Sequence, residues 1–308
     1  MGAQDGPFQS WNVVFQVMMD CMPSVSAMQA LLAELTEDFA RRSAEAWRPD
    51  FWSSRGRREA DSVADLMRSD GVTPWGTAPM EVVWKASELL YVATLEYTRA
   101  TARLMVPPFR TWAPTTEARS AVEAAGQALW LFDLKLPDGR TRIGRYTAMR
   151  LYAARQLEYT YNKVQPAGQL QEFGTPPADI EVQAALLGLA PVLNKKNDVI
   201  GYEDQQAQKI DDRVQRVVGG NSTYSVLSGM AHSDFWSLLG GYRGKAPEPM
   251  GVSDDEYEAD PESFAPLVRA CIQALFKPID NACGMFDRGA LARDLDRLYK
   301  RAVEVMRV

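Results

Sequence analysis

The sequence predicts an all-α protein, one domain over residues 1–308 that forms a single multi-helix bundle of about nine to eleven helices. Three observations favour this class. Apolar residues recur at the spacing of a helix along most of the chain, and no stretch keeps the alternation of a strand. The apolar fraction of 46% and the charged fraction of 24% are ordinary for a globular protein, and the chain is long enough to build a core.

The N-terminal part, residues 1–77, is expected to consist of helices and loops. Residues 1–20 predict a short helix or an arm. Pro23 opens a helix that runs to about Trp47, because five apolar side chains follow helical spacing. These are Met28, Leu31, Leu32, Leu35 and Phe39. A loop over residues 48–57 and a short helix complete this part.

Residues 78–242 are predicted to form the core bundle. Met80–Val106 is the most apolar helix, and apolar residues on most of its surface predict a central position. Ala118–Asp133 is rich in small residues, which allow a neighbouring helix to approach closely. Arg140–Lys163 is a long helix of arginines and tyrosines.

Shorter patterns predict the rest of the core bundle. Ala178–Leu193 and Gln205–Val218 have helical spacing and are joined by the polar segment Asn194–Asp204. Asn221–Tyr242 is a further helix, which follows a glycine pair that breaks the chain. We expect the core to be formed by this helix together with the 80–106 and 118–133 helices.

The C-terminal region begins with a loop. Residues 243–260 are rich in proline, glycine and acid, and predict a mobile acidic loop. Residues 261–308 are expected to hold the C-terminal helices. The last of these has an apolar stripe, which predicts a face docked on the bundle.

Charge and hydropathy limit the partners. The formal net charge of −6 argues against a broad nucleic-acid surface, which needs a basic face. Local basic clusters, at Arg55–Arg58 and between Arg140 and Arg155, leave nucleic acid open as a partner. No membrane span is predicted, because no segment is both long and apolar enough. A signal peptide is not predicted either, since the first Lys or Arg is Arg41.

The cysteines and the histidine limit metal and redox chemistry. Cys21, Cys271 and Cys283 are odd in number and far apart, which is typical of reduced residues in a cytoplasmic protein. A single histidine with scattered cysteines makes no common zinc site, so these residues predict no metal site.

The most distinctive stretch, NSTYSVLSGMAHSDFWSLLGGY, holds the only histidine, His232. Tyr224 and Ser228 precede it at intervals of four, so the three side chains lie along one face of a helix. An imidazole takes and gives protons near neutral pH, which makes His232 a candidate catalytic residue. Tyr224, Ser228 and Trp236 are candidates for substrate binding. A packing histidine that bonds to Ser228 or a carbonyl explains the pattern equally well.

A second polar pair, Arg119 and Glu123, is spaced for an ion pair on an otherwise apolar helix. Both are candidate catalytic residues that would orient His232 or bind substrate, and the alternative is an ordinary pair near a helix start. Trp130 and Arg145 are candidate substrate-binding residues. Arg145 lies on the arginine and tyrosine helix, which also fits a solvated face.

Two acidic segments are similar to the metal-binding motifs of class I isoprenoid cyclases. They are Asn197-Asp198, three residues before Gly201, and Asp211-Asp212, in reversed order. The resemblance implies Mg²⁺ held by both motifs on facing helices. Gly201 stands where the motif has a hydroxyl residue. Mg²⁺ is expected as a cofactor only in this version, and otherwise the cofactor is unknown.

Two longer stretches carry a further resemblance. TEARSAVEAAGQALWLFD (Thr116–Asp133) and YSVLSGMAHSD (Tyr224–Asp234), with the arginine-rich helix between them, resemble a group of uncharacterised actinobacterial helical proteins. That group is similar to the HEPN-like bundles, which include RNases and abortive-infection proteins. The resemblance implies a helical bundle whose shared polar residues are Arg119, Glu123, Tyr224, Ser228 and His232. The Arg-x(4–6)-His pattern of HEPN nucleases is absent, because the nearest upstream arginine is Arg216.

We therefore expect a cytoplasmic enzyme that acts on a small, largely apolar molecule by acid/base chemistry in a helical-bundle pocket. Isoprenoid-type cyclisation is its most specific version. The alternative is a non-catalytic HEPN-like bundle that binds RNA or a protein partner in defence or regulation, and a homodimer is open. The enzyme predicts an enclosed cavity with His232 and Glu123 on its wall. The alternative predicts an exposed groove at a two-fold interface.

Overall fold

The structure is a computed structural model that describes residues 23–47, 54–63, 75, 78–107, 109, 112–164, 175–219, 227–228 and 261–306. Within these residues it contains nine helices and one three-stranded sheet. The predicted all-α class is therefore confirmed. The sheet is the one departure from it.

The helices are, in chain order, α2 (Val25–Ala46), α3 (Ser54–Asp61), α4 (Pro79–Leu104), α5 (Trp112–Leu131), α6 (Gly139–Val164), α7 (Pro177–Leu186), α8 (Ile210–Val218), α11 (Pro261–Met285) and α12 (Gly289–Val305). The antiparallel strands are β1 (Pro191–Leu193), β2 (Val199–Tyr202) and β3 (Gln205–Gln206), in that order. The long predicted helices correspond to α2, α4, α6, α11 and α12. Two helices begin earlier than predicted, α3 at Ser54 and α5 at Trp112.

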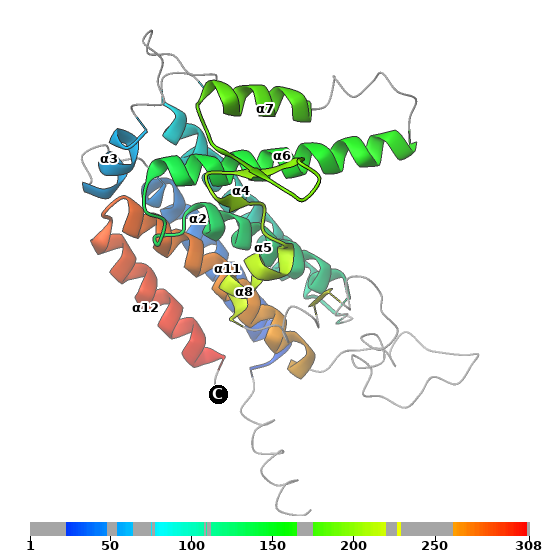
Figure 1. Ribbon diagram of the computed structural model, residues 1–308. Coiled ribbons are helices and arrows are strands. Elements are labelled where there is room, and N and C mark those ends of the chain that lie inside the picture. Colours follow the sequence, from blue (N-terminus) through cyan, green and yellow to red (C-terminus); the bar gives the residue numbers. More distant parts are fainter. Residues whose placement is uncertain are drawn as a thin grey trace, which may run out of the picture.

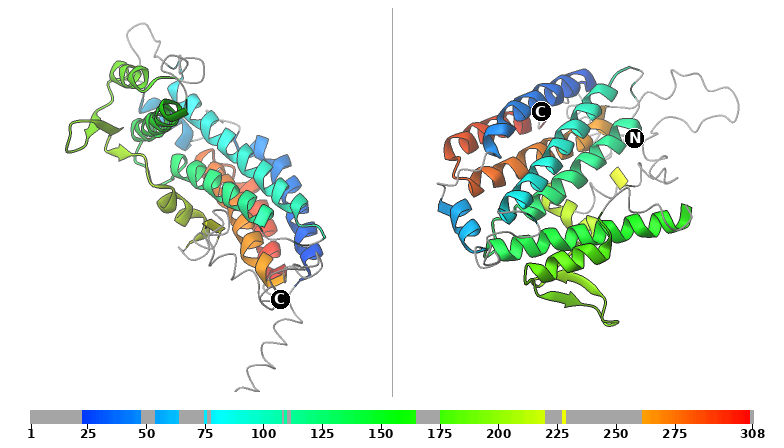
Figure 2. Two further views of the ribbon diagram at one scale, coloured as in Figure 1. Left: turned by 90° about the vertical axis from the view of Figure 1, so that its right-hand side faces the viewer. Right: turned by 90° about the horizontal axis from the view of Figure 1, so that it is seen from above.

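The helices form a bundle with a crossing layer. α2, α4, α5, α11 and α12 run alongside one another, and α6 crosses near one end of them (Figure 1). Two further views show the same bundle with α6 across its end (Figure 2). α7 and the sheet pack against α6. This arrangement brings the start of α6 against the last turn of α5.

The centre of the core is formed by α5 and α11. Both are buried on most sides, with Trp130 and Phe264 fully enclosed. The sequence predicted a core of α4, α5 and Asn221–Tyr242, and it did not include α11 among the core helices. Of Asn221–Tyr242, only residues 227–228 are described.

The prediction that α4 is surrounded by other elements is wrong. Leu89 is 59% exposed and Leu104 is 39% exposed, whereas several hydroxyl residues of α4 face the core. Ser87 donates to the carbonyl of Ala128 in α5 at 3.2 Å, and Thr94 donates to a carbonyl within its own helix. These hydrogen bonds satisfy the hydroxyls, so they can be buried beside apolar residues of α4 such as Val83 and Tyr91, while other apolar residues stay exposed.

Small residues let α8 approach α5, as the sequence predicts. A Cβ added at Gly126 would lie 2.9 Å from the carbonyl oxygen of Arg213, which belongs to α8. Only glycine therefore fits at this crossing. α8 ends at Gly219, whose positive φ of 71° closes the helix as the glycine pair predicts.

The segment between α7 and α8 differs from the predicted pair of helices. α7 stops at Leu186, and the chain continues into β1 instead of a helix to residue 193. The side chain of Asn194 accepts hydrogen bonds from the backbone N–H groups of Lys196 and Asp198, at 2.7 and 3.0 Å. This local turn chemistry folds the polar segment into a hairpin. α8 accordingly begins only at Ile210.

Candidate functional site

A pocket of about 560 Å³ lies over the outer face of the first half of α4. Its described lining comes from α4, the end of α2 and α6. The lining residues are Trp47, Glu81, Val82, Trp84, Lys85, Ala86, Glu88, Leu89 and Tyr146. Sites for small molecules typically measure about 300–1,000 Å³ and are mostly apolar and aromatic. We call this site the α4 pocket.

Trp47 is a buried residue that contributes to the lining of the α4 pocket. The residue is only 3% exposed, and its ring lies 4.6 Å from that of Phe132, measured between centroids. Its indole N–H has no acceptor among the described residues. A buried donor without an acceptor costs about 1–3 kcal/mol.

The other polar groups of the α4 pocket lie at its rim. Lys85 Nζ is 2.7 Å from Glu88 Oε2, and the lysine side chain is 65% exposed. Glu81 is exposed in the first turn of α4. Burial raises the pKa of the Tyr146 hydroxyl, so this group is a neutral donor at physiological pH.

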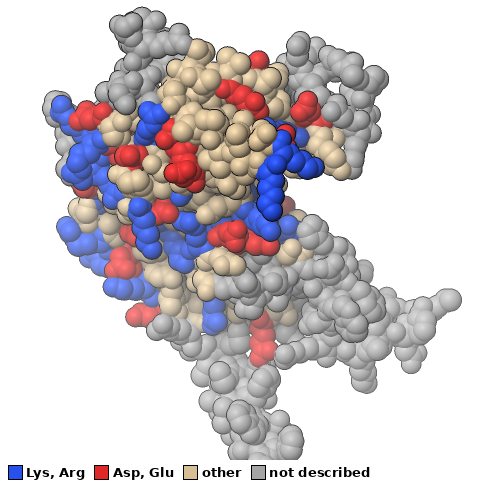
Figure 3. Space-filling model, viewed as in Figure 1, with Lys and Arg blue, Asp and Glu red and all other residues tan. Residues whose placement is uncertain are grey.

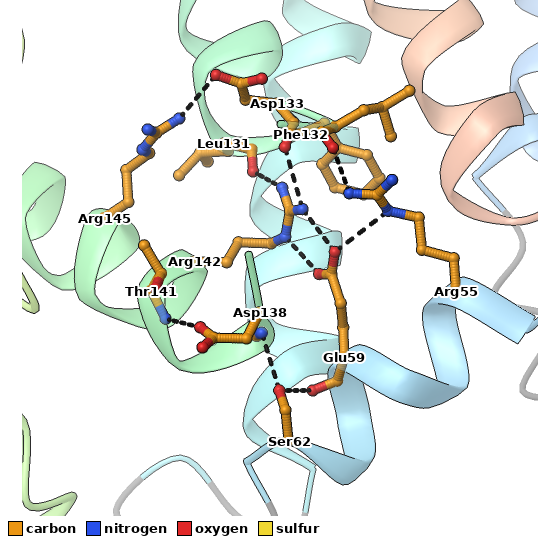
Figure 4. Close-up of polar contacts among 12 residues, drawn as sticks. Arg55, Glu59, Ser62, Leu131, Phe132, Asp133, Asp138, Thr141, Arg142 and Arg145 are labelled. Carbon is orange, nitrogen blue, oxygen red and sulfur yellow. Dashed lines mark hydrogen bonds and ion pairs between the residues drawn. The ribbon is translucent and has the colours of Figure 1, made fainter. Parts of the chain in front are cut away.

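A cluster of charged side chains holds the end of α5 against α3 and α6 (Figure 4). The last carbonyls of a helix have no partner within it. Here the carbonyls of Trp130, Leu131, Phe132 and Leu134 accept hydrogen bonds from Arg145, Arg142, Asn281 and Arg55, respectively. Cations also complement the negative end of a helix dipole. We call these residues the α5 end cluster.

Arg142 and Glu59 form the centre of the α5 end cluster. Arg142 Nε lies 2.6 Å from Glu59 Oε2, and Nη2 lies 2.8 Å from Oε1. The side chains are 0% and 4% exposed. The alternative interpretation of Arg140–Lys163 as a solvated arginine face is therefore wrong for Arg142.

Asp133 connects two further arginines in the α5 end cluster. Its Oδ2 lies 2.6 Å from Arg216 Nη1 and 3.5 Å from Arg145 Nη1. Burial alone would raise the pKa of Asp133, but a bond from the Lys135 N–H and the charge of Arg216 lower it below its ordinary value. Burial lowers the pKa of Arg145 to about 10, so this guanidinium stays charged at neutral pH. The arginines are bonded to protein oxygens, and the cluster acts as a structural clamp.

Arg119 and Glu123 form the predicted ion pair. Nε of Arg119 lies 2.7 Å from Oε1 of Glu123, and the side chains are 18% and 22% exposed. Neither residue is among the described residues that line the α4 pocket. The predicted cavity with Glu123 on its wall therefore does not correspond to this pocket.

Trp130 and Arg145 belong to the α5 end cluster and not to the α4 pocket. The Trp130 ring is fully buried, and the guanidinium carbon of Arg145 lies 5.0 Å from its centroid. Their assignment to substrate binding stays a prediction. Ser228 is half-buried, next to buried Leu227. His232, Tyr224 and Trp236 lie outside the described residues, so their roles stay predictions.

The two acidic motifs do not lie on facing helices. Asn197 and Asp198 are part of the β1–β2 turn, where Asp198 Oδ2 accepts a hydrogen bond from Asn194 at 3.0 Å. Asp211 and Asp212 are exposed in the first turn of α8. The part of the chain that the structure describes holds no group of three or more His, Cys, Asp or Glu residues placed for a metal ion. The helix geometry on which the Mg²⁺ version depends is thus not formed.

Trp47, Val82 and Leu89 are pocket residues that the sequence did not single out as site residues. The available signal was the apolar character of most of the Met80–Val106 surface, because a helix that packs on one side leaves some of these residues exposed. Glu59 carried no signal, since it follows a run of arginines typical of a solvated helix.

The surface charge is mixed. Lys and Arg residues are interspersed with Asp and Glu on the face shown in Figure 3. In α3, for example, Arg57 lies 3.7 Å from Asp61, between Nε and Oδ2. The local basic cluster Arg55–Arg58 is thus partly neutralised, with Arg55 turned toward Glu59.

No protein-family model, curated protein or solved structure matches the chain. The resemblance to HEPN-like bundles accordingly stays a prediction. Among the described helices, none is long and apolar enough to cross a membrane.

Proposed function

We propose that the protein binds a small, largely apolar molecule in the α4 pocket. The observation that carries this proposal is the pocket itself, about 560 Å³ in volume and walled by Trp47, Trp84 and Tyr146. The tryptophans are buried and fix the floor of the pocket, and Leu89, which is 59% exposed, offers apolar contact to a ligand.

A catalytic version of this function assigns proton transfer to His232. Arg119 and Glu123, which form an ion pair and are not among the described residues that line the α4 pocket, would then hold the imidazole in its working orientation. His232 is the only histidine in the chain, so its resonances in a histidine-labelled NMR spectrum are unambiguous. Addition of 1-aminoanthracene, a neutral aromatic probe, is expected to shift them. If the histidine signal is unchanged at saturating probe, His232 does not lie at the pocket. The catalytic version is then wrong, and only the binding function remains.

Binding itself is tested by titrating the full chain with 1-aminoanthracene and following the emission of the probe. We expect saturable binding at one site. Leu89→Lys places a charge in the α4 pocket and is expected to weaken binding at least about tenfold. Val182→Lys is the matched control, because Val182 is 57% exposed on α7 and Leu89 is 59% exposed on α4. Equal affinities in the two variants would contradict the proposal.

A further inference from the structure

α4 carries an apolar stripe along its whole length, on the side away from the core. Its members recur every three or four residues, so they lie in one line. The stripe consists of Val82, Ala86, Leu89, Ala93, Tyr97, Ala100 and Leu104. Each of them is at least partly exposed, and Leu89, Tyr97 and Leu104 reach 59%, 39% and 39%. A continuous exposed apolar surface of this kind marks an interaction site.

The stripe matches itself when its direction is reversed about Ala93. The matched pairs are Val82 with Leu104, Ala86 with Ala100, and Leu89 with Tyr97, at eleven, seven and four positions from Ala93. A two-fold axis at Ala93 would therefore place like-sized residues opposite each other on two antiparallel copies of α4. Self-complementarity is what a two-fold interface requires.

The small residues of the stripe allow close contact between two helices. Ala86, Ala93 and Ala100 recur every seven residues, which is the repeat that keeps one seam of a helix against its partner. Their short side chains let the backbones approach. The larger side chains, such as Leu89, then pack on either side of the seam.

The charges beside the stripe also favour an antiparallel pair. The first half of α4 carries Glu81, Lys85 and Glu88 along this edge, and the second half carries Glu96, Arg99 and Arg103. On α4 itself the excess charge is negative in the first half and positive in the second. Glu37 of α2 pairs with Arg99 at 2.8 Å, so Arg103 is the exposed cation that would meet the negative first half of a second copy. An antiparallel pair brings opposite excesses together, and a parallel pair brings like excesses together. The helix dipoles favour the antiparallel arrangement for the same reason.

We propose that two copies of this chain associate through α4, antiparallel and about a two-fold axis at Ala93. α4 has 26 residues and is about 39 Å long. One helix pair of this length buries less than the roughly 800 Å² per partner of a standard interface, so the dimer is weak and depends on concentration. Tyr97 and Leu104 of the second copy lie over Leu89 and Val82, on the open side of the α4 pocket. The closing of the α4 pocket by the second copy rests on the proposed function, whereas the dimer itself does not.

Cysteine cross-linking of the full chain tests the symmetry. Ala93→Cys is expected to form a disulfide-linked dimer under mild oxidation, because the residue meets its own copy. Ala86→Cys and Ala100→Cys are each expected to stay unlinked alone and to link when mixed. A parallel pair would link each variant to itself, which would overturn the proposal. The proposal would also be overturned if none of the cysteine variants formed more linked dimer than the unsubstituted chain does.

Sedimentation equilibrium tests the dimer without cross-linking. Ala93→Arg is expected to raise the dissociation constant at least about tenfold, with an unchanged circular dichroism spectrum. Val182→Arg, exposed on α7, is the control and is expected to leave it unchanged. A chain that is monomeric at every concentration would overturn the proposal. Probe binding is measured at concentrations where the chain is monomeric, so failure of the dimer and failure of the pocket are distinct results.

Discussion

Arg142 and Glu59 form a two-point ion pair in the interior of the protein, although 83 positions separate them in the sequence. Arg142 also donates to the carbonyls of Leu131 and Asp133 at the end of α5. One guanidinium therefore ties α3 and α6 to the last turn of the central helix. Such a pair costs desolvation when it forms, and breaking it leaves an uncompensated buried charge.

Replacing Glu59 by alanine is expected to lower the free energy of unfolding by about 3–5 kcal/mol, because the buried charge of Arg142 then lacks its carboxylate partner. Urea unfolding followed by circular dichroism measures this. Asp61→Ala is the control on the same helix. Its side chain is 70% exposed beside Arg57, so we expect a change of at most about 0.5 kcal/mol. Similar losses in the two variants would show that Glu59 does not anchor the α5 end cluster.

Asp133→Asn is expected to destabilise the protein at neutral pH and to lose this effect in acid. The pKa of Asp133 is lowered in the folded protein, so the unfolded chain binds a proton at higher pH than the folded one. The stability due to the carboxylate is therefore present above the unfolded pKa of about 3.9, and it is lost as the pH falls further. Urea titrations of both proteins at several pH values measure the difference. A difference that is independent of pH contradicts this account.

Gly126→Ala is expected to lower the free energy of unfolding by about 1–3 kcal/mol, because the added Cβ meets the backbone of α8. Gly289→Ala is the matched control at the start of α12. The nearest heavy atom to its added Cβ is 3.7 Å away, so no loss is expected. Thermal unfolding of the two variants measures the contrast. An unchanged melting temperature in Gly126→Ala would show that α5 and α8 are not in close contact there.

Glu123→Gln tests the acid/base version of the function. A carboxylate beside an imidazole favours its charged form, so removing the charge is expected to lower the pKa of His232. An NMR titration of the single histidine measures it. Glu117→Gln, six residues earlier on α5, is the control and is expected to leave the pKa of His232 unchanged. The same His232 pKa in both variants would remove Glu123 from the proposed chemistry.

The long helices could be predicted because their apolar periodicity extends over many turns, as in α2 and α12. The hairpin over residues 191–206 was missed because it depends on the turn at Asn194, which is a local hydrogen-bond effect with little sequence signal. The ion pair of Arg119 and Glu123 was predictable, since both residues lie on one helix.

The α5 end cluster and the α4 pocket could not be predicted in the same way. The partner of Arg142 is Glu59, which is distant in sequence, and no local pattern selects it from the other acids. The pocket depends on which face of α4 turns inward. The inward face carries apolar residues such as Val83 and Tyr91 together with hydrogen-bonded hydroxyls, and apolar residues on the exposed face hide this difference from a sequence pattern.

The most direct test of the central claim is a crystal structure of the full chain with bound 1-aminoanthracene. We predict density for the probe against Trp47, Leu89 and Tyr146, with its amino group or ring edge at the rim formed by Glu81 and Glu88. Density at another site, or an empty α4 pocket at saturating probe, would contradict the claim that this pocket is the binding site.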